Sequence, residues 1–455
     1  MLWGLHILFA IQLNRKLEKL FAFGITDNTG NKLCVFASSL RPLPEIVKAL
    51  TERELFLKHI AQTSPAPLAL EIVKAEGALL YDAGGKEYID LIGGISVANT
   101  GHRHPQVIEA IKKQLDAYLH IMVYGEFIES PQVQYAKLLT DHLPSSLNSV
   151  YFTNSGAEAV EGAMKLSKRV TGRTKIVAFN NSYHGSTQGA LSIIGDEYWR
   201  NSFRPLLPDV FHLEYGSMND LDFIDNCTAC VIAETIQAEA GIIYPTNEWM
   251  QALRKKCSET GALLILDEIQ TGFGRTGKLW GFEHFDIVPD ILLLGKALGG
   301  GMPLGAFITD KELMWSLTDK PVLGHITTFG GHPVSCAAGM AAFRILMEEK
   351  MIDTVRKKED LFKSLLVHEK IKSVRSFGLW LAVEFDSFET NKKIIDSCIN
   401  SVSGPVNMHG PRSLVTDWFL FASQCLRISP PLNILEQQIK NASEIILSHI
   451  SKIAL

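Results

Sequence analysis

The amino-acid sequence predicts an α/β fold built around a mainly parallel sheet, and two features of its patterning support this. Short aliphatic runs alternate with segments whose apolar residues recur at helical spacing, as expected for βαβ units. The runs are almost continuously apolar, which is typical of strands buried on both faces of a parallel sheet. Ligands of such sheets bind beyond the carboxyl ends of the strands. The expected strands are 149–153, 175–179, 231–234, 262–267 and 291–294.

The first 44 residues differ from the rest of the chain. Residues 1–13 are apolar, but they are too few to span a bilayer, and they lack the charged start and the cleavage site of a secretory signal. A peripheral amphipathic helix is one interpretation of this segment. An appended segment without a function is the other, and we favour it.

Regular patterning begins near residue 45. Residues 77–90 predict a hairpin, and residues 105–115 predict a helix. Ser155 and Glu158 have the spacing of a capping box, so another helix is expected to begin there and to end at Gly172.

The composition describes an ordinary globular protein with a large core, since 46% of the 455 residues are hydrophobic and 20% are charged. A net charge of -5 gives no reason to expect a nucleic-acid partner. Seven cysteines form an odd and low count, which favours a reducing compartment, so we expect a cytoplasmic protein. Cys227 and Cys230 form a CxxC pair, but no second pair follows, so no metal site is expected.

Lys296 and Asp267 each follow an aliphatic run that predicts a buried strand. A lysine withdrawn from water has a lowered pKa and becomes a nucleophile toward carbonyl groups. A carboxylate after such a strand needs a partner, and a protonated pyridine nitrogen is one. Pyridoxal 5'-phosphate (PLP) requires a lysine that forms an imine and an aspartate that keeps the ring nitrogen protonated. PLP is therefore the expected cofactor.

Other residues could complete a PLP site. Ser155, Gly156 and Ala157 leave free amides at a helix N-terminus, where phosphate binds well, although on this segment alone a plain capped helix is favoured. Tyr183 follows a strand and could stack on a flat ring, with loop packing as the alternative. Gln270 could donate a hydrogen bond to the phenolic oxygen of the ring.

Taken in order, five segments make the chain resemble the class III, PLP-dependent aminotransferases of fold type I. The resemblance covers roughly residue 68 to the C-terminus. It implies a large domain with a mainly parallel, seven-stranded type of sheet and a smaller α+β domain at the C-terminus. The segments are 154–158, 183–185, 266–277, 295–301 and 328–333.

The resemblance implies a role for each matching residue around the ring. Lys296 would carry the imine and move the proton, and Asp267 would pair with the ring nitrogen. Gln270 would contact the ring oxygen. Tyr183 would cover the ring, and its neighbour His184 is counted among the cofactor-binding residues.

The resemblance also implies how the phosphate is held. Ser155, Gly156 and Ala157 would bind it within one subunit. Thr328 would reach the phosphate of the neighbouring subunit, so a homodimer is expected.

Two further matches concern the substrate. Arg427 matches the arginine that grips an α-carboxylate, and Glu239 matches the glutamate that pairs with it in ω-amino-acid aminotransferases. The pair would be closed for an amine without a nearby carboxylate and open for glutamate. The expected reaction is a ping-pong transfer from the terminal (ω) amine of an amino acid or a diamine to a 2-oxo acid such as 2-oxoglutarate.

The chain departs from the family pattern in three places, of which Ala238, where the family usually has a glycine before the switch glutamate, is a minor one. Ser186 stands where ornithine and acetylornithine aminotransferases usually carry an arginine, which argues against ornithine. Residues 401–418 fit the pattern poorly. From their positions alone, the candidates for the substrate pocket are Ser96, Val97, Tyr124 and Ser186.

Three other functions compete with this interpretation. A PLP-dependent aminomutase of the glutamate-1-semialdehyde type would need no external 2-oxo acid, and Glu239 opposite Arg427 argues against it. A binding protein that kept the fold without turnover would have no use for Lys296 and Asp267. An NAD-dependent enzyme is suggested by the GxGxxG match at 272–277, but no amphipathic helix follows that match.

The domain organisation expected from these patterns has four parts. The partners expected are an amine donor, a 2-oxo acid and a second copy of the chain, with no nucleic acid and no membrane. The parts are an extension at 1–44, a segment at 45–95 that packs with the small domain, a large PLP-binding domain at 96–335 and a small C-terminal domain at 336–455.

Overall fold

The computed structural model describes residues 50–401 and 413–452, so the interpretations of residues 1–44 lie outside the described residues. The chain divides into two compact units, residues 1–69 and 70–455. In the first unit, α2 (Glu52–His59) begins with a capping box, in which the side chains of Thr51 and Glu54 each accept a hydrogen bond from the other's backbone. The second unit holds the other described elements.

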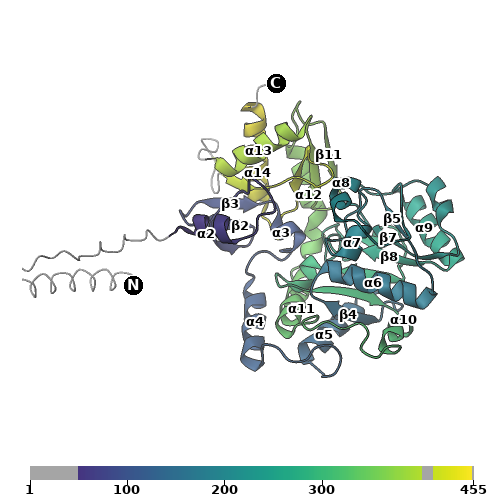
Figure 1. The fold of residues 1–455 in the computed structure, drawn as a ribbon. Coiled ribbons are helices and arrows are strands. Elements are labelled where there is room, and N and C mark those ends of the chain that lie inside the picture. Colours follow the sequence, from purple (N-terminus) through teal and green to yellow (C-terminus); the bar gives the residue numbers. More distant parts are fainter. Residues whose placement is uncertain (1–49, 402–412, 453–455) are drawn as a thin grey trace, which may run out of the picture. The chain divides into compact units, whose positions relative to one another are not determined.

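The second unit contains a seven-stranded sheet (Figure 1). All neighbouring strands are parallel except at β10, which runs antiparallel to both of its neighbours. The strands other than β10 therefore end at one common edge. In spatial order they are β4 (Ser149–Thr153), β10 (Gly305–Thr309), β9 (Ile291–Leu294), β8 (Leu263–Asp267), β7 (Thr228–Glu234), β5 (Lys175–Phe179) and β6 (Val210–Leu213).

The five strands expected from the sequence all belong to this sheet. Every residue of β7 and β9 is buried, which confirms the prediction of strands covered on both faces. The sequence patterns did not predict β6 or β10. The first is a partly exposed edge strand of four residues, and the second begins with a glycine soon after a glycine-rich turn, so neither presents a long apolar run.

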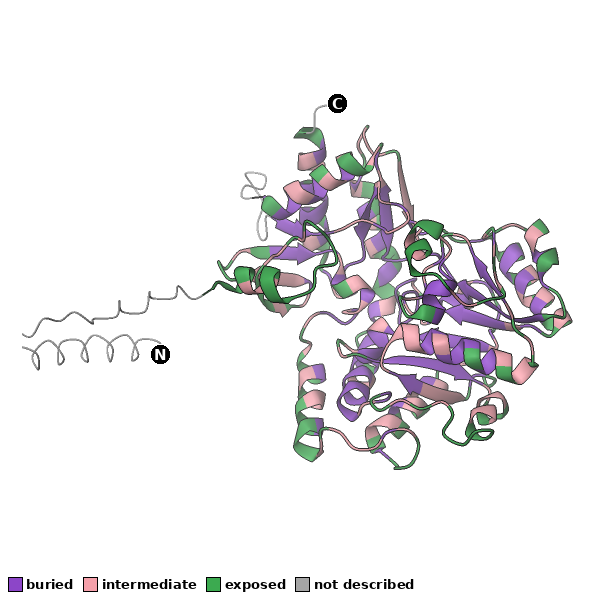
Figure 2. Cartoon of the chain, in the orientation of Figure 1, coloured by how far each residue is buried: buried purple, intermediate pink, exposed green. Residues whose placement is uncertain are grey.

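Two hydrophobic cores lie on opposite faces of the large sheet, as the alternation of side chains along its strands requires. Ile176, Ile232 and Ile265 pack on one face against α6 (Gly156–Thr171). Neighbouring residues of the same strands point to the other face, toward α9 (Asn247–Thr260). Figure 2 shows the burial concentrated on the strands and on the inner sides of the helices.

The remaining helices of the second unit flank these cores or the smaller sheets. They are α3 (Gly93–Ser96), α4 (Pro105–Ala117), α5 (Ser130–Thr140), α7 (Gln188–Ser192), α8 (Glu197–Arg200), α10 (Lys311–Trp315), α11 (Pro333–Glu348), α12 (Val355–Leu365), α13 (Phe388–Asn400) and α14 (Glu436–Lys452). Among the described residues, none of the helices combines the length and the apolar composition that crossing a membrane requires.

Two smaller sheets complete the second unit. In the first, the order is β1 (Ile72–Glu76), β2 (Leu79–Asp82), β3 (Glu87–Asp90) and β13 (Ser413–Val415), and β2 and β3 form the expected hairpin. The last strand of this sheet joins parallel to β3, although more than 300 residues separate the two in sequence. The other sheet consists of β11 (Ser373–Ser376), β12 (Leu381–Glu384) and β14 (Cys425–Ile428). The domain boundaries expected near residues 45, 95 and 335 stay predictions.

Candidate active site

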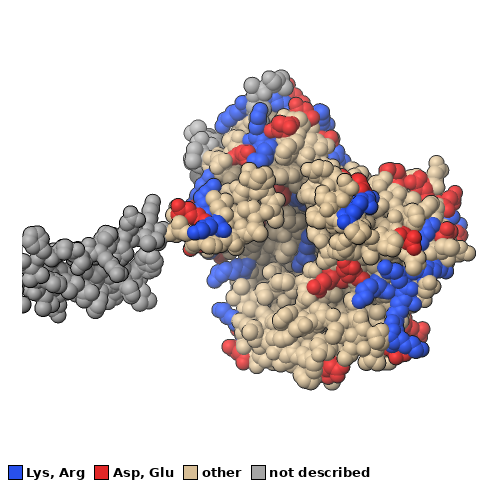
Figure 3. Space-filling model, viewed as in Figure 1, with Lys and Arg blue, Asp and Glu red and all other residues tan. Residues whose placement is uncertain are grey.

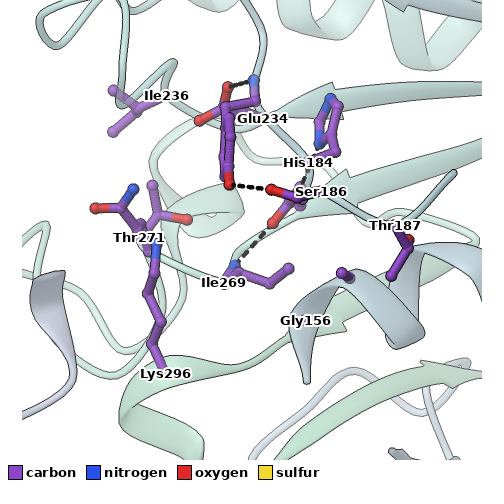
Figure 4. Close-up of a pocket in the computed structure, with 14 residues that line it drawn as sticks. Gly156, His184, Ser186, Thr187, Glu234, Ile236, Ile269, Thr271 and Lys296 are labelled. Carbon is purple, nitrogen blue, oxygen red and sulfur yellow. Dashed lines mark hydrogen bonds and ion pairs between the residues drawn. The ribbon is translucent and has the colours of Figure 1, made fainter. Parts of the chain in front are cut away.

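A cavity of about 500 Å³ opens at the edge where the parallel strands end, and its size suits a small-molecule ligand. Its walls come from the segments that follow β4, β5, β7, β8 and β9 (Figure 4). Ser155, Glu239, Thr328 and Arg427 are not among the lining residues. Seven of the predicted site residues do line the cavity, namely Gly156, Ala157, Tyr183, His184, Asp267, Gln270 and Lys296.

Lys296 follows the buried strand β9 and extends into the cavity toward Thr271 (Figure 4). Its backbone has a φ of 48°, in the left-handed region that residues other than glycine rarely adopt. Burial lowers the pKa of its ammonium group to about 8, although the carboxylates of Glu239 and Asp267 act in the opposite direction. A larger fraction of Lys296 is therefore neutral, and nucleophilic, than of an ordinary lysine.

Asp267 ends β8 and is held by two neighbours. Its Oδ2 lies 2.7 Å from Nδ1 of His184, and its Oδ1 accepts a hydrogen bond from the amide of Ile269 at 3.0 Å. The side chain is only 4% exposed, so an isolated charge there would be unfavourable without these partners. A carboxylate offers about four lone-pair directions, so Asp267 can also accept a bond from a protonated ring nitrogen.

His184 was expected among the cofactor-binding residues without a specific role, and the structure supplies one. Its Nδ1 contacts Asp267, while its Nε2 is buried without a hydrogen-bond partner among the described residues. The imidazole therefore orients the carboxylate, and the spacing between two residues 83 positions apart could not reveal this.

Glu234 is a site residue that sequence reasoning missed. It ends β7 and lies opposite Asp267 in the strand register. Its two oxygens accept hydrogen bonds from the amides of Tyr183 and Ala238, each at 2.9 Å. Burial, reinforced by the neighbouring charge of Asp267, raises the pKa of Glu234 to about 8. A carboxylate at the end of a predicted strand was the available signal.

The N-terminus of α6 forms the other end of the cavity. Ser155 caps the helix, since its Oγ accepts a hydrogen bond from the amide of Glu158 at 3.2 Å. The second half of the expected capping box differs, because the carboxylate of Glu158 accepts from the amide of Asn154 instead. Gly156 and Ala157 line the cavity, and the helix end favours an anion there. These small residues fit the phosphate group of PLP.

The loop that contains Gly185 packs closely against the first turn of α6. Gly185 has a φ of 125°, and a Cβ atom placed there would lie 2.6 Å from the Cβ of Ala157. A larger residue at position 185 would displace the first turn of α6. The glycine thus holds the Tyr183 loop against the helix.

Glu239 and Arg427 form a closed ion pair next to the cavity. The two carboxylate oxygens accept from Nη1 and Nη2 of the arginine at 2.9 and 2.8 Å, and both side chains are buried. Burial alone would raise the pKa of Glu239, but the guanidinium of Arg427 lowers it below the ordinary value. Gln270 links the pair to the cavity, because it lines the cavity and its Nε2 lies 3.4 Å from Oε1 of Glu239.

Three other predicted positions have simple placements. Ser186 lines the cavity, and its hydroxyl lies 3.1 Å from the hydroxyl of Tyr183. Thr328 is exposed and lies outside the cavity. Ser96, Val97 and Tyr124 are not among the lining residues.

The other motifs of the sequence contribute no second site. Residues 272–277 form turns without a following α-helix, so the GxGxxG match has no dinucleotide-binding geometry. Cys227 is exposed, Cys230 is buried in β7, and both are free. Within residues 50–401 and 413–452, no group of three or more His, Cys, Asp or Glu side chains is arranged to hold a metal ion.

Comparison with known proteins agrees with this geometry. The family model described as aminotransferase class-III matches residues 60–450. An acetylornithine aminotransferase of Methanopyrus kandleri is 42% identical over 346 residues, covering 75% of this chain and 87% of that protein. A LysW-aminoadipate semialdehyde/glutamate semialdehyde transaminase of Sulfurisphaera tokodaii is 39% identical over 321 residues, covering 69% and 81%.

A solved structure gives the same result for the fold. The ornithine aminotransferase of Toxoplasma gondii, with partial occupancy of PLP at its active site, superposes with a TM-score of 0.78 at 29% identity. The match covers 89% of this chain and 96% of that one. The fold expected from the sequence, a type I PLP-dependent transferase with a mainly parallel seven-stranded sheet, is confirmed.

Proposed function

The chain belongs to the class III aminotransferase family, and we propose that this member transfers a terminal amine to a 2-oxo acid. It is a transaminase, and its cofactor is PLP. The donor we propose is an ω-amino acid or a diamine, and the acceptor is an acid such as 2-oxoglutarate. The closed pair of Glu239 and Arg427 beside the cavity is the observation that carries this proposal.

Each of the cavity residues has a part in this chemistry. Bound PLP supplies the carbonyl carbon that accepts the amine and a ring that withdraws electrons from the reacting carbon. Lys296 moves the proton at its Nζ, and its lowered pKa suits that exchange near neutral pH. Asp267, oriented by His184, keeps the ring nitrogen protonated. Gly156 and Ala157 hold the phosphate at the start of α6.

The ion pair separates the two half-reactions of a ping-pong cycle. While Glu239 neutralises Arg427, this arginine is not free to attract a carboxylate near the reacting amine. A terminal amine meets this requirement. When a 2-oxo acid arrives, its carboxylate takes the place of Glu239 on the two Nη groups, which suit a bidentate contact.

The choice of donor follows from the lining residues. Ser186 replaces the arginine of the ornithine and acetylornithine enzymes, and no arginine lines the cavity among the described residues. A carboxylate on the donor therefore meets no arginine among the described residues that line the cavity. The relatives support a terminal amine, because a semialdehyde is what remains when such an amine is removed.

A homodimer in the cytoplasm is also part of the proposal. Phe127, Ile128, Ile326 and Phe329 are at least half exposed, and they flank the exposed Thr328. The stretches 124–132 and 327–331 lie side by side, since Nε2 of Gln132 contacts the carbonyl oxygen of Gly331, and Tyr124 and Thr327 line a common cavity. In the view of Figure 3, few charged side chains lie on the lower part of the molecule, where Figure 1 places α5. The low cysteine count supports a reducing compartment.

The test mixes the PLP-loaded enzyme with diamines, ω-amino acids and α-amino acids, each with and without 2-oxoglutarate. We expect loss of the cofactor's visible absorbance with terminal amines and glutamate formation only when 2-oxoglutarate is present. Changing Lys296→Ala should reduce turnover by more than about a thousandfold. The exposed Lys255→Ala is the matched control and should behave like the unchanged enzyme. Product formation from one substrate without a 2-oxo acid would instead identify an aminomutase.

A further inference from the structure

Arg427 has a second carboxylate partner that the reaction scheme above does not use. Its Nε donates to Oδ1 of Asp417 at 2.8 Å, and the carboxylate is largely buried. The carbonyl of Trp418 accepts from Nη2 at 3.0 Å, and the ring of Phe419 lies 4.4 Å from the guanidinium carbon. Three consecutive residues thus surround the arginine on the sides that Glu239 leaves open.

The same segment also contacts Glu239. Its Oε2 accepts a hydrogen bond from the amide of Leu420 at 3.0 Å, and its backbone carbonyl accepts one from the amide of Phe421 at 3.0 Å. We call residues 417–421 the clasp. It lies mostly beyond the part of the chain, 401–418, that fits the family pattern poorly, and Asp417 and Trp418 belong to both.

The geometry gives the two carboxylates different tasks. Arginine has five N–H groups, and the Nη1 and Nη2 pair at its tip is the edge that binds a carboxylate in a bidentate manner. Glu239 occupies that edge, whereas Asp417 occupies Nε. When Glu239 moves away, the contacts of Asp417, Trp418 and Phe419 remain, and they keep the tip pointing in the same direction.

A purely structural role for the Asp417 side chain is not needed to hold the clasp in place. The backbone already does this, because the amide of Arg427 donates to the carbonyl of Asp417 at 2.9 Å. In addition, the Thr416 hydroxyl donates to the carbonyl of Arg427 at 2.5 Å. The contact between the Asp417 carboxylate and Nε therefore acts on the guanidinium rather than on the strand.

We propose that Asp417 is a positioning residue, which fixes the guanidinium of Arg427 so that its tip can accept the carboxylate of a 2-oxo acid once Glu239 has left. This proposal rests on the proposed function, since it assigns the acceptor carboxylate to Arg427. It also makes Asp417 a determinant of specificity, because it affects acceptors with a carboxylate and not those without one.

Binding of glutarate is the first test, since this dicarboxylate has no keto group and cannot react. Calorimetry on the PLP-loaded enzyme should give at least tenfold weaker glutarate binding for Asp417→Ala. Asp417→Asn, whose amide oxygen can still accept from Nε, should weaken glutarate binding by less than half as much on a logarithmic scale. Glu239→Gln removes the competing carboxylate and should strengthen the binding. Circular dichroism and cofactor absorbance confirm that each variant is folded and loaded.

The acceptor half-reaction is the second test. After the enzyme has been converted to its aminated form, 2-oxoglutarate and butanal are compared as acceptors by stopped-flow absorbance. For Asp417→Ala, the second-order rate constant with 2-oxoglutarate, divided by that with butanal, should be at least tenfold lower than for the unchanged enzyme. Equal losses with both acceptors, or unchanged glutarate binding, would overturn the positioning role. If the unchanged enzyme accepts an amine from no donor, the proposed function fails instead, whatever the glutarate measurement gives.

Discussion

Lys296 combines a strained backbone with a shifted side-chain equilibrium. Its φ of 48° costs about 1–3 kcal/mol for a residue other than glycine, and such strain persists only where the surroundings impose it. Here the buried strand β9 precedes the residue, and the turn Lys296–Gly299 follows directly. Position and protonation of the amine are therefore both set by the end of one strand.

The lowered pKa of Lys296 predicts the pH dependence of its reactivity in the cofactor-free protein. Because the pKa falls from its ordinary value to about 8, about a tenth of the side chains are neutral at pH 7, against well under about one in a thousand for an ordinary lysine. Acetylation of Lys296, followed by mass spectrometry, should rise with pH to a midpoint near 8. Glu239 raises the pKa of Lys296, so Glu239→Gln should move the midpoint lower. A midpoint near that of Nα-acetyl-lysine amide in the same buffers would contradict this prediction.

The sequence could identify those residues of the site that follow a long apolar run. Asp267 and Lys296 stand at the ends of such runs, so the expense of an isolated buried charge made both conspicuous. Asp417 and Glu234 were not found, because their meaning depends on a partner that only the fold brings near. Nothing in the spacing of Asp417 and Arg427 shows that an antiparallel bridge between Trp418 and Leu426 brings their side chains within 2.8 Å.

At the scale of elements, Arg275 joins parts of the chain that are distant in sequence. It lies in the turns after β8 and is fully buried. Its guanidinium donates to the carbonyls of Leu379 and Pro430 at 2.8 and 2.7 Å, and to Oδ1 of Asn99 at 2.6 Å. Burial lowers the pKa of Arg275 to about 9. Arg275 therefore links the turns after β8 to the segments that contain Asn99, Leu379 and Pro430.

Changing Arg275→Ala should destabilise the protein by about 3–5 kcal/mol, because it leaves three buried acceptors without a donor. The midpoint of thermal unfolding, followed by circular dichroism, should fall by several degrees. Arg204→Ala is the matched control, since both members of its ion pair with Glu197 are about half exposed, and we expect it to change stability by less than about 1 kcal/mol. Similar midpoints for the two variants would show that the buried contacts are dispensable.

The elements themselves were predictable in proportion to their apolar length. The strands 149–153, 175–179 and 291–294 match the structure residue for residue, because each is a compact hydrophobic run. β10 escaped prediction although it is fully buried, and its antiparallel direction has no local signature. The pairing of β3 with β13 was equally invisible, since register between distant segments is decided by packing.

At the scale of the whole molecule, the position of Thr328 bears on assembly. Its side chain is exposed and lies outside the cavity of its own chain. Ile326 and Phe329, close to it in sequence, are at least half exposed, and Ile128 is 94% exposed. A patch of this kind favours association with another protein surface. In the proposed homodimer, Thr328 of one subunit would lie at the phosphate site of the other subunit.

Changing Thr328→Ala should leave a dimer but weaken its hold on PLP about tenfold, because one hydroxyl hydrogen bond to the phosphate is lost. Sedimentation would measure the dimer, and dialysis followed by absorbance would measure the retained cofactor. Thr318→Ala, at another exposed threonine whose hydroxyl bonds to the carbonyl of Trp315, is the control. A monomer that retains PLP fully in both the unchanged and the changed protein would rule out this contribution from a second subunit.

The path of the chain around Leu91 has a consequence for engineering. Its amide donates to the carbonyl of Val415 at 2.9 Å, and its carbonyl accepts from the amide of Ser429 at 2.7 Å. The segment around Leu91 therefore lies between the stretch that precedes Asp417 and the stretch that follows Arg427. Chimeras that exchange the first hundred or so residues with those of a relative would carry a different segment between these two stretches. Their preference among amino-group acceptors should change, even though every residue that lines the cavity is retained.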